Sequence, residues 1–168
     1  MKRFAPIAFL LMMMCAAALS GCQRPAEDHL TINGKVFIFN IRLARAYYAL
    51  NLNRVGAVPD GAIVRAEFEN PAGGPPLVAS QKVFPGMTRI DLQSPDLECV
   101  VADRAYKIHI ELQSPEGKLL QAIDTTLAST ADQTVMPEAP LVEGPAYDRN
   151  SKAFDEEGRI RFRKACPS

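Results

Sequence analysis

The sequence predicts an all-β protein: a small β-sandwich of about seven or eight strands, followed by an irregular C-terminal extension. Apolar and polar residues alternate with a period of two in several short segments, a pattern typical of strands with one buried face. Turns that contain Pro or Gly separate these segments at close spacing. The 168 residues include 13 Pro, which favours turns over long helices.

Residues 30–39 predict the first strand. One face would carry Leu30, Ile32, Gly34, Val36 and Ile38, and the other Phe37 and Phe39. Because both faces are apolar, we expect this strand to be buried in a packed sheet. Residues 41–52 fit both periods, since some apolar residues have helical spacing and others alternate. We expect a strand here, because the surrounding segments are β.

From residue 59 onward the alternation is clearer. Turns over residues 59–61, 85–86, 94–96 and 114–117 separate expected strands at 64–68, 77–84, 88–92, 106–112 and 119–127. The segment 106–112 has the strongest period of two. We expect its apolar residues to face the core and the three between them to face solvent; the inward residues are Tyr106, Ile108, Ile110 and Leu112, and the outward residues are Lys107, His109 and Glu111.

The β-sandwich should occupy residues 30–129, and residues 130–168 form the extension. The extension is rich in Pro and in small polar residues, which predicts mostly irregular structure. Within it, residues 159–164 suggest a late edge strand with Ile160 and Phe162 turned inward. The basic residues of that segment would discourage pairing with other chains.

The N-terminal residues 1–21 have the features of an export signal. Lys2 and Arg3 precede an apolar run that is shorter than the ~20 residues of a membrane-spanning helix. The run ends in Leu19-Ser20-Gly21-Cys22, which resembles the lipobox of bacterial lipoproteins. This resemblance implies cleavage before Cys22 and lipidation of that residue, with residues 22–29 as a tether. Gln23, in place of Asp, implies sorting to the outer membrane, facing the periplasm. The alternative is an ordinary signal peptide that contains a Cys.

The charge of the chain argues against nucleic-acid binding, and its cysteines predict a disulfide. The 19 basic and 19 acidic residues balance, and removal of Lys2 and Arg3 leaves a net charge of about −2, without the basic excess that nucleic-acid binding requires. Cys99 and Cys166 are the two thiols that remain after export and lipidation. In an oxidising compartment we expect them to form a disulfide that ties the C-terminus to a central strand, with a redox pair as the alternative.

No catalytic, metal or cofactor motif is present in the sequence. His29 falls in the tether and His109 on an outward strand face, where we expect both to be solvated. We therefore expect no enzymatic activity, no metal site and no cofactor. Tyr47 and Tyr48 either belong to the core or form a partner surface, since aromatic residues that packing does not absorb often bind partners.

Residues 59–68, 77–83, 89–92, 103–110, 117–120 and 124–126 carry turns and strands that resemble the pilotin-like, type III secretion lipoprotein chaperone family. The resemblance implies an envelope lipoprotein with a small β-sandwich, a family in which some members deliver a secretin to the outer membrane. It implies no catalytic residue. Residues 41–52 and the tail after Ser129 have no counterpart in that pattern.

From these observations we expect a membrane-anchored protein that binds another envelope protein, as a pilotin or assembly chaperone for a secretion component. The alternative is a periplasm-facing carrier or sensor of a small apolar ligand.

Overall fold

A computed structural model describes residues 28–166. The predictions for residues 1–21 and for Cys22 lie outside the described residues. Residues 28–166 contain nine strands in three antiparallel sheets, with short 3-10 turns and no α-helix. The predicted all-β class is confirmed. In the part of the chain that the structure describes, no helix is long and apolar enough to cross a membrane.

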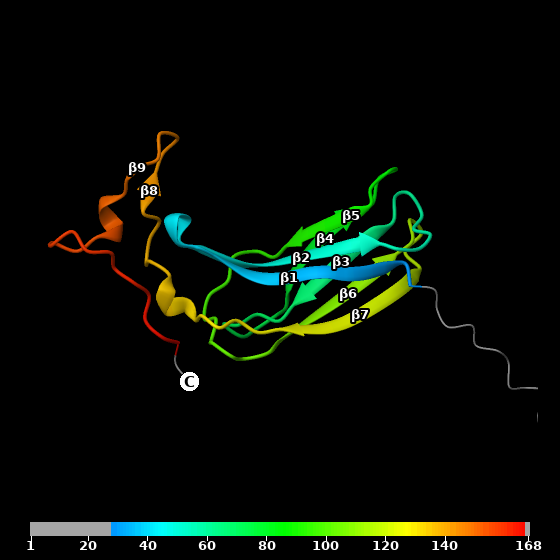
Figure 1. Cartoon of the computed structure of the whole chain (residues 1–168), viewed down its shortest axis with the longest axis horizontal. Helices are drawn as coiled ribbons and strands as arrows, with labels where there is room; N and C mark the ends of the chain where they lie inside the picture. Colours follow the sequence, from blue (N-terminus) through cyan, green and yellow to red (C-terminus); the bar gives the residue numbers. More distant parts are fainter. Residues whose placement is uncertain (1–27, 167–168) are drawn as a thin grey trace, which may run out of the picture.

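Two sheets form the sandwich (Figure 1). The first has the order β1-β2-β5, with β1 (Leu30–Asn40), β2 (Arg45–Arg54) and β5 (Arg89–Gln93). The second has the order β4-β3-β6-β7, with β3 (Ile63–Phe68), β4 (Leu77–Lys82), β6 (Tyr106–Gln113) and β7 (Leu119–Leu127). Pro-Gly turns end several of these strands, as the sequence predicts.

The core lies between the inner faces of the two sheets. The four predicted inward residues of β6 are at most 1 % exposed, and Val64, Ala66 and Phe68 of β3 are fully buried beside them. From the first sheet, Tyr48, Leu50 and Ile90 complete this layer. Lys107, His109 and Glu111 lie on the outer face, as predicted. The alternation of apolar and polar residues therefore predicted the buried face correctly in strands that have only one apolar face.

Residues 41–52 divide between two elements. The 3-10 turn η1 (Ile41–Leu43) begins where the side chain of Asn40 accepts a hydrogen bond from the Leu43 amide, and it ends at Ala44, whose φ is 51°. β2 follows from Arg45. The predicted strand is thus wrong for residues 41–43, because the Asn40 cap and the left-handed Ala44 form a tight connection between β1 and β2.

A β-bulge divides β1 into two halves. Ile32 pairs with Leu52 and Gly34 pairs with Asn51, so Asn33 has no partner residue in β2. Because of the extra residue, the side chains after the bulge point to the opposite face of the sheet from the one that simple alternation predicts. Leu30 and Phe37 are therefore buried, whereas Val36 is 48 % exposed. The prediction that residues 30–38 share one face, and that both faces are covered, is wrong beyond the bulge.

Side chains rather than backbone bonds close the seam between β1 and β7. The Gln121 side-chain oxygen accepts from the amides of His29 (2.9 Å) and Leu30 (2.8 Å), and its nitrogen donates to the Leu30 carbonyl. Lys35 occupies an inward register position and donates to Thr125 and to the Thr126 carbonyl. His29 is accordingly half-buried rather than solvated, and the domain begins before residue 30.

The C-terminal extension packs against the end of the sandwich where η1 lies (Figure 1). It contains the 3-10 turns η2 (Gln133–Val135) and η3 (Ser151–Ala153) and a hairpin of β8 (Val142–Glu143) and β9 (Asp148–Arg149). Met136 and Ala153 are fully buried. The predicted strand at 159–164 is wrong: Ile160 and Phe162 form only isolated bridges, and Phe162 is 47 % exposed.

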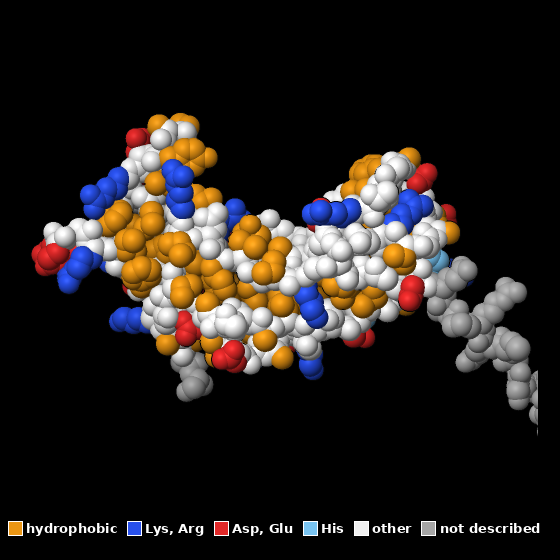
Figure 2. Space-filling view, in the orientation of Figure 1, with side chains coloured by type: hydrophobic (Ala, Val, Ile, Leu, Met, Phe, Trp, Pro, Cys, Tyr) orange, Lys and Arg blue, Asp and Glu red, His pale blue; other side chains and the backbone are white. Residues whose placement is uncertain are grey.

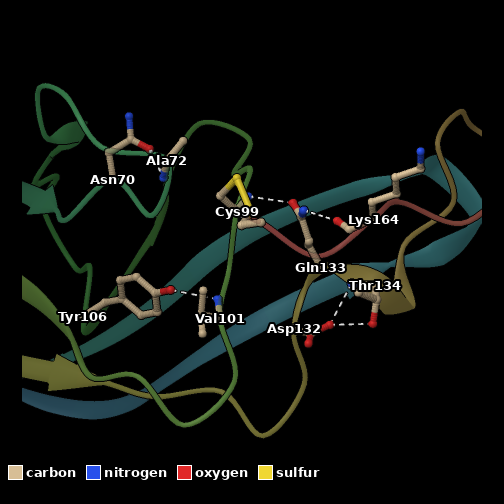
Figure 3. The surroundings of a disulfide bond; sticks show 10 residues. Asn70, Ala72, Cys99, Val101, Tyr106, Asp132, Gln133, Thr134 and Lys164 are labelled. Atoms are coloured by element: carbon tan, nitrogen blue, oxygen red, sulfur yellow. Dashed lines mark hydrogen bonds between the residues drawn. A yellow bond between two sulfur atoms is a disulfide. The ribbon is translucent and has the colours of Figure 1, made fainter. Parts of the chain in front are cut away.

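The predicted disulfide between Cys99 and Cys166 is present, with a Cα–Cα distance of 5.4 Å (Figure 3). Cys99 lies in the loop between β5 and β6, with a φ of 63°, and not on a central strand as expected. Gln133 links the two segments that the disulfide joins, since its side chain accepts from the Cys99 amide (2.9 Å) and donates to the Lys164 carbonyl. The disulfide and the Gln133 side chain hold residues 164–166 against the domain.

Candidate binding surface

The outer face of the β1-β2-β5 sheet carries an open groove of about 620 Å³. We call it the outer groove. Its floor consists of residues on the outward face of the sheet; they are Gly34, Val36 and Ile38 of β1, Tyr47, Ala49 and Asn51 of β2, and Asp91 and Gln93 of β5. The bulge at Asn33 creates this floor, because it turns Val36 and Ile38 outward.

Strand register orders the floor from apolar to polar. Ile38 lies opposite Tyr47, and Val36 lies opposite Ala49. The next position pairs Gly34 with Asn51, and Asn51 with Asp91 of β5. One end of the outer groove is therefore apolar, and the other presents amide and carboxylate groups.

Gly34 lowers the floor where these two ends meet. Its φ is not positive, and a Cβ atom built on it would have no neighbour within 4 Å. Neither backbone conformation nor core packing therefore requires Gly at this position. An interior strand Gly often marks a bulge or the close approach of another chain. In the sequence, Gly34 was the signal for this site, although the pattern of residues 30–38 placed it on a buried apolar face.

The charged side chains around the outer groove are paired with one another. Arg89 and Asp91 lie 3.2 Å apart on the rim, and Arg45 and Asp96 lie 2.9 Å apart beyond its apolar end. The Asn51 amide also donates to Asp91, and Asn33 donates to Asn51 at 2.7 Å. Lys35 borders the outer groove, but its ammonium group is held in the seam with β7.

The two candidate surface tyrosines have different environments. Tyr48 is fully buried, stacks on Phe68 with ring centroids 5.0 Å apart, and donates to the Glu69 carbonyl at 2.8 Å. Burial raises the pKa of its phenol well above the usual range. Its assignment to a partner surface is therefore wrong. Tyr47 is half-buried and lines the outer groove.

Further apolar side chains are exposed near the C-terminal extension. Figure 2 shows hydrophobic side chains gathered over the extension and over the neighbouring end of the β1–β2 hairpin. Ile41 in η1 is 44 % exposed and Tyr147 is 58 % exposed. Arg42 lies over the Tyr147 ring, 4.8 Å from its centroid. The extension thus adds apolar surface beyond the apolar end of the outer groove.

His109 belongs to a small polar cluster on the outer face of the other sheet. Its Nδ1 lies 2.7 Å from Asp124, and its Nε2 lies 3.4 Å from Glu111. The hydrogen bond with Asp124, together with that of Glu111, raises the pKa of the imidazole above its usual value. The expectation of a merely solvated His is wrong in this respect.

Within residues 28–166, no cluster of three or more His, Cys, Asp or Glu is arranged to hold a metal ion.

Comparison with known proteins adds little to this description. No protein-family model matches the chain. No curated protein matches it. Among solved structures, an FMN-binding beta-glucuronidase from Facaelibacterium prausnitzii L2-6 is 17 % identical, with a TM-score of 0.40, over 60 % of this chain and 15 % of that chain. An endonuclease/exonuclease/phosphatase from Beutenbergia cavernae DSM 12333 is 14 % identical, with a TM-score of 0.32, over 57 % of this chain and 27 % of that chain. Scores this low support no inference about function.

Proposed function

We propose that this protein is a non-enzymatic, lipid-anchored lipoprotein of the bacterial envelope that binds another envelope protein through the outer groove. The observation that carries the proposal is the outward apolar pair of Val36 and Ile38 beside Tyr47 on an open sheet face. Exposed contiguous apolar surface on a folded domain is typical of a partner site. Aromatic residues such as Tyr are enriched at the centres of such sites.

The location in the envelope rests on the N-terminal sequence. Cys22 would carry the lipid and anchor the chain to the outer membrane on its periplasmic side. The disulfide between Cys99 and Cys166 is in keeping with an oxidising compartment. Leu30, where β1 begins, and the extension lie at opposite ends of the sandwich (Figure 1). An anchor before β1 would therefore leave the extension and the apolar end of the outer groove distant from the membrane.

The class of partner follows from the family resemblance. Several turn and strand segments between residues 59 and 126 resemble pilotin-like lipoproteins, so a secretin-like subunit or another secretion component is the partner we propose. In this role the lipid supplies location, and the outer groove supplies recognition.

Site-specific photo-crosslinking in the native envelope tests this proposal. A benzophenone amino acid at Gln93, on the part of the groove floor that the edge strand β5 forms, should give a discrete adduct with a second envelope protein. The same probe at Val78, which is 41 % exposed on the other sheet, should not. Equal adducts from both positions, an adduct of two copies of this chain, or a lipid that co-purifies in place of a protein would each contradict the proposal.

A further inference from the structure

We infer that the outer groove binds an uncharged, extended polypeptide segment of the partner, whose main chain lies over Gly34. This inference rests on the proposed function and specifies the chemistry of the partner.

The charges of the outer groove are the first reason. Arg89 and Asp91 neutralise each other at one end, and Arg45 and Asp96 do so beyond the other. The Lys35 ammonium group is directed away from the floor and donates to the Thr126 carbonyl at 2.6 Å. On the floor itself the arginine and the carboxylate are paired with each other, and the one ammonium group nearby, that of Lys35, is turned towards β7, so complementarity favours a neutral segment. The same pairing disfavours phosphate groups, which require available cations.

The shape of the floor is the second reason. From Ile38 to Gly34 the outer groove follows β1 for four residue steps, a length of about 13 Å. Gly34 of β1 and its diagonal neighbour Ala49 of β2 carry the smallest groups of the floor, whereas Val36 and Tyr47 carry larger ones. Because a Cβ on Gly34 would meet no atom within 4 Å, the open space lies directly above the backbone. A polypeptide main chain can approach closely at such a position.

The mixture of groups on the floor is the third reason. The apolar pair Val36 and Ile38 suits apolar side chains of the segment. The Asn51 amide bonds Asn33 and Asp91, and it keeps a second N–H and a second oxygen lone pair that can bond the N–H and C=O groups of an extended chain. An acyl chain has no group that could use this remaining hydrogen-bonding capacity.

Substitutions at Ala49 test the charge of the segment, with the Gln93 photo-probe in membranes that contain the full chain. Ala49→Lys and Ala49→Glu should each reduce the adduct about tenfold relative to Ala49→Gln, which adds similar volume without charge. The adduct should vary less than about twofold between ~0.05 M and ~0.5 M NaCl, because screening acts on charge pairs. If either charged variant strengthens the adduct, or if salt abolishes it, the inference is overturned while the proposed function stands.

A second variant tests the shape. Gly34→Leu should abolish the adduct, because its side chain would fill the space above the floor. Ser80→Leu adds a side chain on the outer face of the other sheet and should leave the adduct unchanged. Thermal unfolding of both variants shows whether the fold survives; if Gly34→Leu unfolds the protein, Ala49→Leu replaces it. A folded Gly34→Leu variant that retains the full adduct would overturn the inference. Loss of the adduct from the unsubstituted chain would instead overturn the proposed function.

Discussion

Tyr47 and Tyr48 are adjacent in the sequence and lie on opposite faces of β2. Successive side chains of a strand point to opposite faces, so one tyrosine lines the outer groove while the other fills the core. The difference also governs their chemistry. The Tyr48 hydroxyl is satisfied by the Glu69 carbonyl inside the protein, whereas Tyr47 remains partly accessible to a partner.

Tyr48→Ala should lower the free energy of unfolding by about 3–5 kcal/mol, because it removes a fully buried aromatic ring and leaves a cavity. Tyr47→Ala should lower it by less than about 1 kcal/mol, as a half-buried surface change. Urea denaturation of the two variants measures both values. Equal losses would contradict the assignment of Tyr48 to the core and Tyr47 to the surface.

His109 should titrate above the pKa of about 6.5 that a free imidazole shows, because Asp124 and Glu111 stabilise its protonated form. Since the pKa is raised on folding, this interaction stabilises the fold fully below about pH 6.5 and is lost as the pH rises through the folded-state pKa. The Asp124 carboxylate is 84 % exposed, so the contribution to stability is small.

NMR titration of the imidazole checks this prediction. Asp124→Asn should lower the pKa of His109 more than Glu111→Gln does, because the Asp124 hydrogen bond is the larger cause. An unchanged pKa in Asp124→Asn would exclude that cause.

At the scale of elements, β1 carries the informative irregularities. The bulge at Asn33 turns its second half over, and Gln121 and Lys35 attach its free edge to β7 through side chains. An inward-pointing charged residue at a strand edge is a known obstacle to pairing with another chain. The seam is thus closed to an added strand, while the face of the same sheet stays open.

Gln121→Ala should lower the free energy of unfolding by about 1–3 kcal/mol, because the amides of His29 and Leu30 lose their acceptor. Hydrogen exchange at the Leu30 amide should accelerate more than exchange in β6. Gln113→Ala is a suitable control, since that side chain donates only to the Glu111 carboxylate at the surface. If exchange at Leu30 does not change, the Gln121 side chain does not hold the start of β1.

For the whole molecule, the disulfide joins the extension to the sandwich. The buried residues of the extension are Met136, Pro137, Asn150 and Ala153. Its remaining attachments include Arg163, whose guanidinium donates to the Ala44 carbonyl at 3.0 Å. A segment with so few buried side chains depends on a cross-link for its stability.

Reduction of Cys99–Cys166 should lower the free energy of unfolding by about 4 kcal/mol, because the bond closes a loop with a sequence separation of 67. The double variant Cys99→Ser/Cys166→Ser should match the reduced protein. Denaturation with and without reductant measures the difference, and identical midpoints would contradict a stabilising role.

Lipidation of Cys22 is expected to direct the whole molecule to the membrane. The mature protein should begin at Cys22 and carry several acyl chains, since a single chain gives only reversible binding. Mass spectrometry of the N-terminal peptide checks this. Cys22→Ala should yield uncleaved or soluble protein, whereas a wild-type N-terminus without an acyl mass would contradict the anchor.

The sequence by itself determined the all-β class, the turns, the buried faces of β3 and β6, and the pairing of Cys99 with Cys166. In these strands one face is apolar, so the period of two leaves a single way to bury it. If Cys15 and Cys22 are lost to the signal and to the lipid, Cys99 and Cys166 allow only one intramolecular pair.

Tertiary structure alone decided which face of β1 is covered, where the extension packs, and that an open groove exists. An alternating segment with two apolar faces does not show which of them a neighbour will cover. The bulge at Asn33 is a mismatch in residue number between β1 and β2, and it exists only once the two strands pair. The outer groove follows from that pairing, because the extra residue of the bulge is what turns Gly34 and Val36 to the outer face.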